Sequence, residues 1–285
     1  MASGFDERKL KAFERRILVR KRMLVLAIAG LSVAGIMLVG CAGGKGATGT
    51  LQFYANGEDF VRQGFVSKDG WSINFDHVYI SLADVTAYQT DPPYDPHSGA
   101  DVKGKVKVSL PETYTVDLAE GGADAAPILV GKVKNAAAGH YNAISWEMVK
   151  AFSGSANGYS LVIVGTAEKA GQSIDFNIKV DTEYGYSCGE FVGDERKGIV
   201  QQGGTADVEM TFHFDHIFGD ADTPMDDDLN VGAVGFEPFA NIAQGGKLDV
   251  DMAGCQSKLT ANDYQALVDI LPTLGHVGEG HCHCH

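Results

Sequence analysis

The stretch Ile73-Asn-Phe-Asp-His-Val-Tyr-Ile-Ser-Leu82 decides the fold class, because its side chains follow the period of two that is typical of a β-strand. The polarity of the two faces is mixed. Apolar residues lie first on the face of Ile73 and further on at Val78 and Ile80, on the opposite face. This pattern predicts a strand whose buried face changes along its length.

Similar alternation recurs on both sides of this stretch, and 36 glycines separate the candidate strands. Helical periodicity is almost absent before residue 259. We therefore predict a mainly β fold, an antiparallel two-sheet sandwich over residues 49–258. The further candidate strands are Leu51–Ala55, Val102–Leu110, Ile128–Lys134, His140–Val149, Ser160–Ala167, Ser173–Val180, Ala206–Phe218 and Lys247–Met252.

One short C-terminal helix is expected within residues 259–274. Thr260 can cap it, with Asp263 at the third helical position. An apolar stripe then follows the spacing i, i+3, i+4, i+7 from Tyr264 to Leu271. Pro272 and Gly275 end the pattern. We expect this helix to pack on the sandwich and to carry a His/Cys-rich tail, residues 275–285.

The segment Gly139-His-Tyr-Asn-Ala-Ile-Ser-Trp-Glu-Met148 resembles a strand opening of bacterial transthyretin-like or immunoglobulin-like sandwiches. The resemblance covers about ten residues. It implies that Ile144, Trp146 and Met148 face the core of a periplasmic β-sandwich.

The N-terminus carries a second resemblance, to bacterial lipoprotein precursors. Arginine and lysine residues precede the apolar run Met23–Val39, and Leu38-Val39-Gly40-Cys41 is similar to a lipobox. The resemblance implies a signal peptide over residues 1–40, acylation of Cys41 as the lipid anchor, and a flexible tether over residues 41–48. The alternative is an uncleaved signal anchor, because the apolar run has about the minimum length that spans a bilayer.

The same resemblance implies a location in the bacterial cell envelope. In Gram-negative lipoproteins a residue other than aspartate after the cysteine, here Ala42, implies the outer membrane, at its periplasmic face or at the cell surface. Residues 1–40 hold eight of the 23 Lys and Arg residues but three of the 37 Asp and Glu residues, so the remainder has a formal charge near −19. Such a chain repels nucleic acid and attracts cations, which excludes nucleic acid as a partner.

Four cysteines remain after Cys41 is assigned to the lipid. Export to an oxidising compartment favours disulfides. Cys188 and Cys255 lie in loop-like contexts, and a bond between them is one of two open alternatives, the other being free thiols. Cys282 and Cys284 are separated by one residue, so a bond between them would be strained.

The last eleven residues provide the strongest chemical signal, because short His/Cys tracts are typical of metal binding. Imidazole and thiolate are ligands that zinc and copper select. We expect a transition metal here, unless the segment is an unselected terminus. The candidate ligands are His276, His281, Cys282, His283, Cys284 and His285.

A second candidate site lies in Thr211-Phe-His-Phe-Asp-His-Ile-Phe218. If this segment is a strand, His213 and Asp215 share one face, and His216 at its end could turn toward the same ion. His276 could connect this site to the tail. The alternative is a half-buried strand whose histidines bind nothing.

An acidic loop follows at once, and clustered carboxylates suit calcium. The spacing lacks the glycine and the glutamate of an EF-hand, so a solvated acidic loop is the alternative. The residues concerned are Asp220, Asp222, Asp226, Asp227 and Asp228.

The His-x-Asp strand, the acidic loop and the lipid anchor together resemble secreted copper-handling sandwiches of the methanobactin-associated type. Neither Trp71 nor Trp146 aligns with that family's motif. We expect a lipoprotein that captures or transfers copper or zinc, without enzymatic activity and with no catalytic residue to name. A surface interaction or assembly module with an incidental tail is the second hypothesis. A metallohydrolase is the third, since it needs three ordered ligands and an open position.

Overall fold

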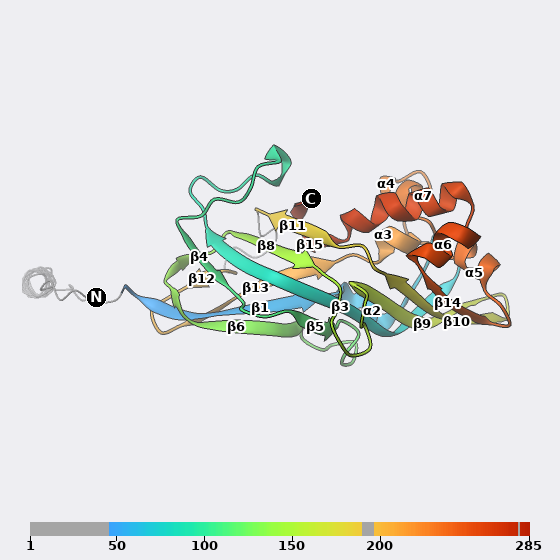
Figure 1. Ribbon diagram of the computed structural model, residues 1–285, viewed down its shortest axis with the longest axis horizontal. Helices are drawn as coiled ribbons and strands as arrows, with labels where there is room; N and C mark the ends of the chain where they lie inside the picture. Colours follow the sequence, from blue (N-terminus) through green and yellow to red (C-terminus); the bar gives the residue numbers. More distant parts are fainter. Residues whose placement is uncertain (1–45, 190–196, 279) are drawn as a thin grey trace, which may run out of the picture. The chain divides into compact units, whose positions relative to one another are not determined.

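The computed structural model describes residues 46–189, 197–278 and 280–285, which fall in the unit Gly46–His285. The expected signal peptide, the lipobox and Cys41 lie outside the described residues. The part of the chain that is described is mainly β, which confirms the predicted class (Figure 1). Its strands are β1 (Thr48–Asn56), β2 (Phe65–Val66), β3 (Ser72–Gln89), β4 (Val106–Ser109), β5 (Tyr114–Asp117), β6 (Ile128–Ala137), β7 (Gly139–His140), β8 (Ala143–Met148), β9 (Leu161–Lys169), β10 (Gln172–Val180), β11 (Tyr184–Cys188), β12 (Ile199–Val200), β13 (Thr205–Phe212), β14 (Lys247–Asp251), β15 (Gly275–Val277) and β16 (Gly280–Cys284).

Strand β3 contains the stretch that predicts the fold class, and its buried face changes as expected. Ile73 is buried, and further along the buried residues are Val78 and Ile80, which have the opposite parity. The register against β9 shifts between Phe75 and His77. An irregularity of this kind moves the following side chains to the other face of the sheet, which explains the change.

The strands form one hydrogen-bonded path of 14 strands, in the order β14-β10-β9-β3-β8-β11-β16-β15-β13-β1-β6, with β2, β4 and β5 also pairing with β3. A separate two-stranded sheet joins β12 and β7. Most neighbours are antiparallel, but β1 runs parallel to β13 and β10 runs parallel to β14. The pairing is therefore mixed where the prediction was purely antiparallel.

Most of the helices gather at one end of the sheet, on the right in Figure 1. The sequence predicted one C-terminal helix. In the described residues, several segments expected to be loops also form helices. The helices are α2 (Glu58–Gln63), α3 (Asp215–Phe218), α4 (Asp228–Gly232), α5 (Glu237–Ile242), α6 (Met252–Lys258) and α7 (Ala261–Ile270), with 3-10 turns η1 (Pro96–Ser98) and η2 (Leu271–Thr273).

The predicted C-terminal helix itself is present as α7. Thr260 Oγ1 accepts a hydrogen bond from the backbone N–H of Asp263, at 3.2 Å, as the capping pattern indicated. The other helices have four to seven residues and escaped prediction, because two turns or fewer show little periodicity. None of the helices described here is long and apolar enough to cross a bilayer.

One main hydrophobic core joins the strands. It includes Ile144, Trp146 and Met148, the three side chains expected to face inward from β8. Trp146 stacks on Tyr186 with 5.3 Å between ring centroids and contacts Phe212 of β13 at 5.9 Å. These contacts hold the ends of β13 and β15 in place, where the candidate site lies.

The segment expected as a tail is part of the sheet. Strands β15 and β16 pair with each other, β15 also pairs with β13, and β16 pairs with β11. The tail interpretation of residues 275–285 was therefore wrong in its structure, since most of these residues complete the hydrogen-bonded path. The reason is that Gly275-His-Val277 and the alternating Gly280–Cys284 find backbone partners on both sides.

Candidate metal centre

The centre begins where β13 ends. The predicted strand Ala206–Phe218 was too long, because β13 stops at Phe212 and helix α3 starts at Asp215. The backbone N–H of His213 donates to the carbonyl oxygen of Leu274 at 3.1 Å, which fastens this turn to the start of β15. His213 and Asp215 therefore meet through a tight turn and not through strand alternation.

Strand β15 adds another imidazole. Thr211 lies opposite His276 in the register between β13 and β15, so His276 comes beside His213. The ring centroids of these two histidines are 4.3 Å apart, and the ring of His216 lies 5.4 Å from that of His213 and 5.2 Å from that of His276. We call His213, Asp215, His216 and His276 the histidine cluster.

Most of the cluster is buried, with His216 half-buried, and donor atoms of three members come close together. His213 and Asp215 are each 8% exposed, and His276 is 7% exposed. One ligand atom from each of His213, Asp215 and His216 can be chosen so that all three lie within 4.8 Å of one another. This spacing suits ligands that surround one ion at about 2.0–2.2 Å each.

Thr273 orients two of the rings. Its hydroxyl donates to the carbonyl oxygen of Ile270 at 2.8 Å, so the same oxygen accepts a hydrogen bond from Nδ1 of His216, also at 2.8 Å. The carbonyl oxygen of Thr273 accepts from Nε2 of His276 at 3.0 Å. The uncharged rings then carry their lone pairs on Nε2 of His216 and on Nδ1 of His276. Such hydrogen bonds fix the tautomer of a metal-binding histidine.

Two buried polar atoms of the cluster make no hydrogen bond within the described residues: Nε2 of His213 and Oδ1 of Asp215. Nearly all buried polar atoms in proteins are hydrogen-bonded, so a pair of exceptions in one cluster calls for an explanation. A bound cation would satisfy both atoms at once.

Glu58 approaches the cluster from α2. Its Oε1 lies 3.5 Å from Nε2 of His213, although 155 residues separate the two in sequence. The backbone of Glu58 has a φ of 60°, a left-handed conformation that side-chain-bearing residues rarely adopt. Sequence reasoning missed Glu58 and Thr273, because no local pattern indicates either residue.

Among the side chains that the structure describes, Cys282, His283, Cys284 and His285 do not join the cluster. Cys282 forms a disulfide with Cys188, which lies opposite it in the register between β16 and β11. Of the two alternatives for Cys188 and Cys255, the bond between them does not form, since Cys255 is a buried free thiol in α6. Strand pairing that brings residues 94 positions apart together could not be read from loop context.

The free thiol of Cys284 is poorly suited to bind a metal. Burial, together with the nearby carboxylate of Glu147, raises its pKa to about 11, so the thiol stays protonated at neutral pH. Burial likewise raises the pKa of Cys255 to about 11.

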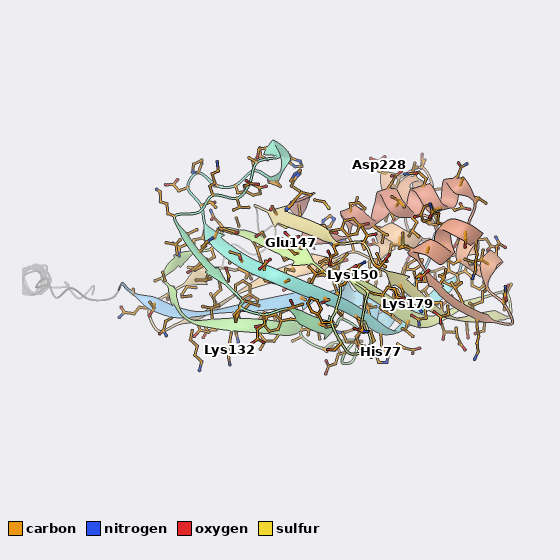
Figure 2. All side chains as sticks on the ribbon, in the orientation of Figure 1. His77, Lys132, Glu147, Lys150, Lys179 and Asp228 are labelled. Carbon is orange, nitrogen blue, oxygen red and sulfur yellow. A yellow bond between two sulfur atoms is a disulfide. The ribbon has the colours of Figure 1, made fainter. Side chains whose placement is uncertain are left out.

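His283 and His285 form a separate surface pair. Their rings stack with centroids 6.0 Å apart, and Nε2 of His285 lies 3.7 Å from Oε1 of Glu147, which Figure 2 labels on β8. The backbone of His281 lies opposite His276 in the hairpin.

The acidic loop is held by its own hydrogen bonds. Asn230 accepts from the backbone N–H of Asp220 and donates to the carbonyl oxygens of Asp220, Thr223 and Pro224. Asp220 also accepts from Thr223, and Asp227 caps α4. In the described parts of the chain, Asp220, Asp222, Asp226, Asp227 and Asp228 do not form a group of three carboxylates close enough to share an ion. Asp228 lies at the helical end of the molecule (Figure 2).

Comparison with known proteins gives no match, whether with protein families, with curated proteins or with solved structures.

Proposed function

We propose that this chain is an envelope-anchored lipoprotein that binds one divalent transition metal ion, zinc or copper, in the histidine cluster, for capture or transfer. The observation that carries the proposal is the pair of buried atoms, Nε2 of His213 and Oδ1 of Asp215, that lack hydrogen bonds within the described residues. They belong to a group of three ligands whose donor atoms lie within 4.8 Å of one another. A bound cation would give Oδ1 of Asp215 a partner, and Nε2 of His213 one besides Glu58.

The donor set favours Zn(II) or Cu(II) over Cu(I). The cluster offers imidazole nitrogen and carboxylate oxygen, whereas Cu(I) selects thiolate and thioether sulfur. The sulfur of Cys282 is committed to the disulfide, and the raised pKa of Cys284 disfavours its thiolate. The C-terminal cysteines thus support the fold, and the histidine that follows β13 binds the ion together with those of α3 and β15.

We infer further that the scaffold is a two-sheet sandwich in which β16 belongs to both sheets. Strand β16 pairs on one side with β11 and on the other with β15. The contact of Trp146 with Phe212, from β8 to β13, supports packing of one layer on the other. The cluster then lies at the edge where the layers meet.

The lipid anchor is tested separately. We expect a Cys41→Ser variant to lose both incorporation of labelled palmitate and recovery in the membrane fraction, with the wild-type chain as the reference. An unchanged palmitate signal in the variant would contradict lipidation of Cys41.

The metal is tested by stoichiometry on the full chain, purified in detergent without a histidine tag. The metal-free chain is loaded with Zn(II) or Cu(II), desalted and measured by mass spectrometry of the elements. We expect one equivalent in the wild type and its loss in the double variant His213→Ala, His216→Ala. The matched control is His283→Ala, His285→Ala, which removes two imidazoles outside the cluster and should keep the ion.

Two results would overturn the proposal. One is no bound metal in the wild type after loading, and the other is loss of metal only in the control. Circular dichroism of both metal-free double variants separates loss of ligands from loss of the fold.

A further inference from the structure

A cavity of about 560 Å³ lies next to the histidine cluster, at the junction of β1 and α2. Its lining includes two carboxylates and two amides. The lining residues are Asn56, Glu58, Asp59, Phe60, Gln63 and Gly64.

Glu58 connects this cavity to the cluster. It lines the cavity, and its Oε1 is 3.5 Å from Nε2 of His213, the buried atom that makes no hydrogen bond within the described residues. Its side chain is 26% exposed, whereas that of His213 is 10% exposed. The carboxylate therefore lies between solvent and the buried imidazole.

The position of Glu58 is held by a chain of contacts. The side-chain oxygen of Asn56 accepts from the backbone N–H of Glu58 at 3.1 Å, and the amide nitrogen of Asn56 donates to Glu209 at 3.0 Å. Lys197 pairs with the same carboxylate of Glu209 at 3.0 Å. These contacts maintain the left-handed backbone of Glu58, a strained conformation of the kind that persists where the surroundings fix it.

We propose that this cavity is the entrance to the metal centre and that Glu58 passes a hydrated divalent cation from Asp59 and solvent to His213; this inference rests on the proposed function. Carboxylate oxygens are the ligands that best replace water around such a cation, and imidazole then holds a borderline metal more firmly. Two carboxylates in one concave site also raise the local cation concentration and the association rate.

The test measures the rate at which the full chain in detergent binds Cu(II). A site that suits zinc binds Cu(II) with at least equal affinity. Stopped-flow mixing with the metal-free chain is followed by the visible absorption of the protein-bound Cu(II), which an added tryptophan does not change, and dissociation is measured with excess chelator. The variants are Glu58→Gln, which removes the charge, and Gln63→Trp, which adds bulk to the lining at an exposed position. The control is Glu112→Gln, an exposed carboxylate between β4 and β5.

We expect Glu58→Gln and Gln63→Trp each to lower the association rate about tenfold or more. The dissociation rate should not rise in either variant. In Gln63→Trp it should fall together with the association rate. The association rate of the wild type should fall with added salt more steeply than that of Glu58→Gln. The control should match the wild type.

Three results overturn the inference, and they differ in what else they affect. Equal association rates in the wild type, Glu58→Gln and Gln63→Trp would exclude this entrance but leave the metal centre intact. A faster dissociation with an unchanged association rate in Glu58→Gln would make Glu58 a ligand and not part of an entrance. No Cu(II) binding by the wild type would overturn the metal centre itself.

Discussion

Thr273 contacts two imidazoles of the histidine cluster with two different atoms, its hydroxyl and its carbonyl oxygen. Neither His216 nor His276 can change its tautomer without losing a hydrogen bond at this residue. A buried metal centre needs rings whose lone pairs already point at the ion, because reorientation on binding lowers the affinity. Thr273 therefore fixes which ring nitrogen carries the lone pair in His216 and in His276.

Replacing Thr273 by Val keeps the shape of the side chain but removes the acceptor for Nδ1 of His216. We expect the metal dissociation constant to rise about 10- to 100-fold, the usual effect of losing such a partner. Competition with a chromophoric chelator measures the change. Thr273→Ser retains the hydroxyl and should bind nearly as the wild type does, and equal losses in both variants would contradict this role.

The free thiols should be nearly inert in the folded protein. Burial raises the pKa of both Cys255 and Cys284 from 9.0 to about 11, so at pH 8 the thiolate fraction is about 100-fold lower than in the unfolded chain. Alkylation at pH 8, followed by peptide mass spectrometry, should be slower by at least about that factor in the native protein than in guanidinium chloride.

The same pKa shifts make the stability of the fold depend on pH in the alkaline range. Folding raises these two pKa values, so the stabilisation is complete below pH 9 and is lost as the pH rises through about 11. In the alkylation experiment described above, a rate in the native protein equal to that in guanidinium chloride would show that neither thiol is protected.

The residues of the cluster could be predicted from the sequence, but their geometry could not. The spacing of His213, Asp215 and His216 pointed to one site, and His276 was expected to connect to it. The predicted strand was wrong because a helix of four residues, α3, has too few residues to show a period of 3.6. Glu58 lay beyond prediction, since its contact with His213 depends on how β1 pairs with β13.

At the scale of elements, the hairpin of β15 and β16 is part of the sheet, where the sequence predicted a tail. It fills the place between β11 and β13 in the sheet, and without it two strands would have unpaired edges. Alternation of His and Cys is a metal signature by composition and a strand pattern by period. Which of the two applies depends on partners that are distant in sequence.

A chain that ends at Leu274 should therefore fail to fold stably, even without metal. It lacks β15, β16 and the disulfide partner of Cys188. We expect loss of the cooperative unfolding transition, measured by circular dichroism of the metal-free protein. A cooperative transition at the wild-type midpoint would show that the segment is dispensable, as a true tail would be.

The disulfide should stabilise the fold considerably, because it closes a long loop. Cys188 and Cys282 are 94 residues apart, and loss of a native bond of this kind costs about 2–5 kcal/mol. Guanidinium unfolding with and without dithiothreitol measures this free energy. The double variant Cys188→Ala, Cys282→Ala should be insensitive to the reductant, and an insensitive wild type would contradict the pairing.

For the whole molecule, the formal net charge of −14 favours cations over anions near the surface. Binding at a buried centre that exists only in the folded state must also stabilise the protein. At a free Zn(II) concentration 100 times the dissociation constant, we expect the free energy of unfolding to rise by about 2.7 kcal/mol. The His213→Ala, His216→Ala variant should show no such rise, and an equal rise in both would place the ion elsewhere.

The mainly β class followed from side-chain alternation, because period two is visible in each strand alone. The order of the strands, the parallel pairs and the place of β16 between β11 and β15 did not follow, since they depend on contacts between distant segments. The same long-range pairing brings β13, β15 and α2 together around the histidine cluster.

X-ray absorption spectroscopy of the Zn(II)-loaded full chain tests the central claim most directly, because it distinguishes nitrogen and oxygen ligands from sulfur. We predict a first shell of nitrogen and oxygen atoms at about 2.0–2.2 Å, with the outer-shell scattering of imidazole. Sulfur at about 2.3 Å would place the ion on the C-terminal cysteines and contradict the account.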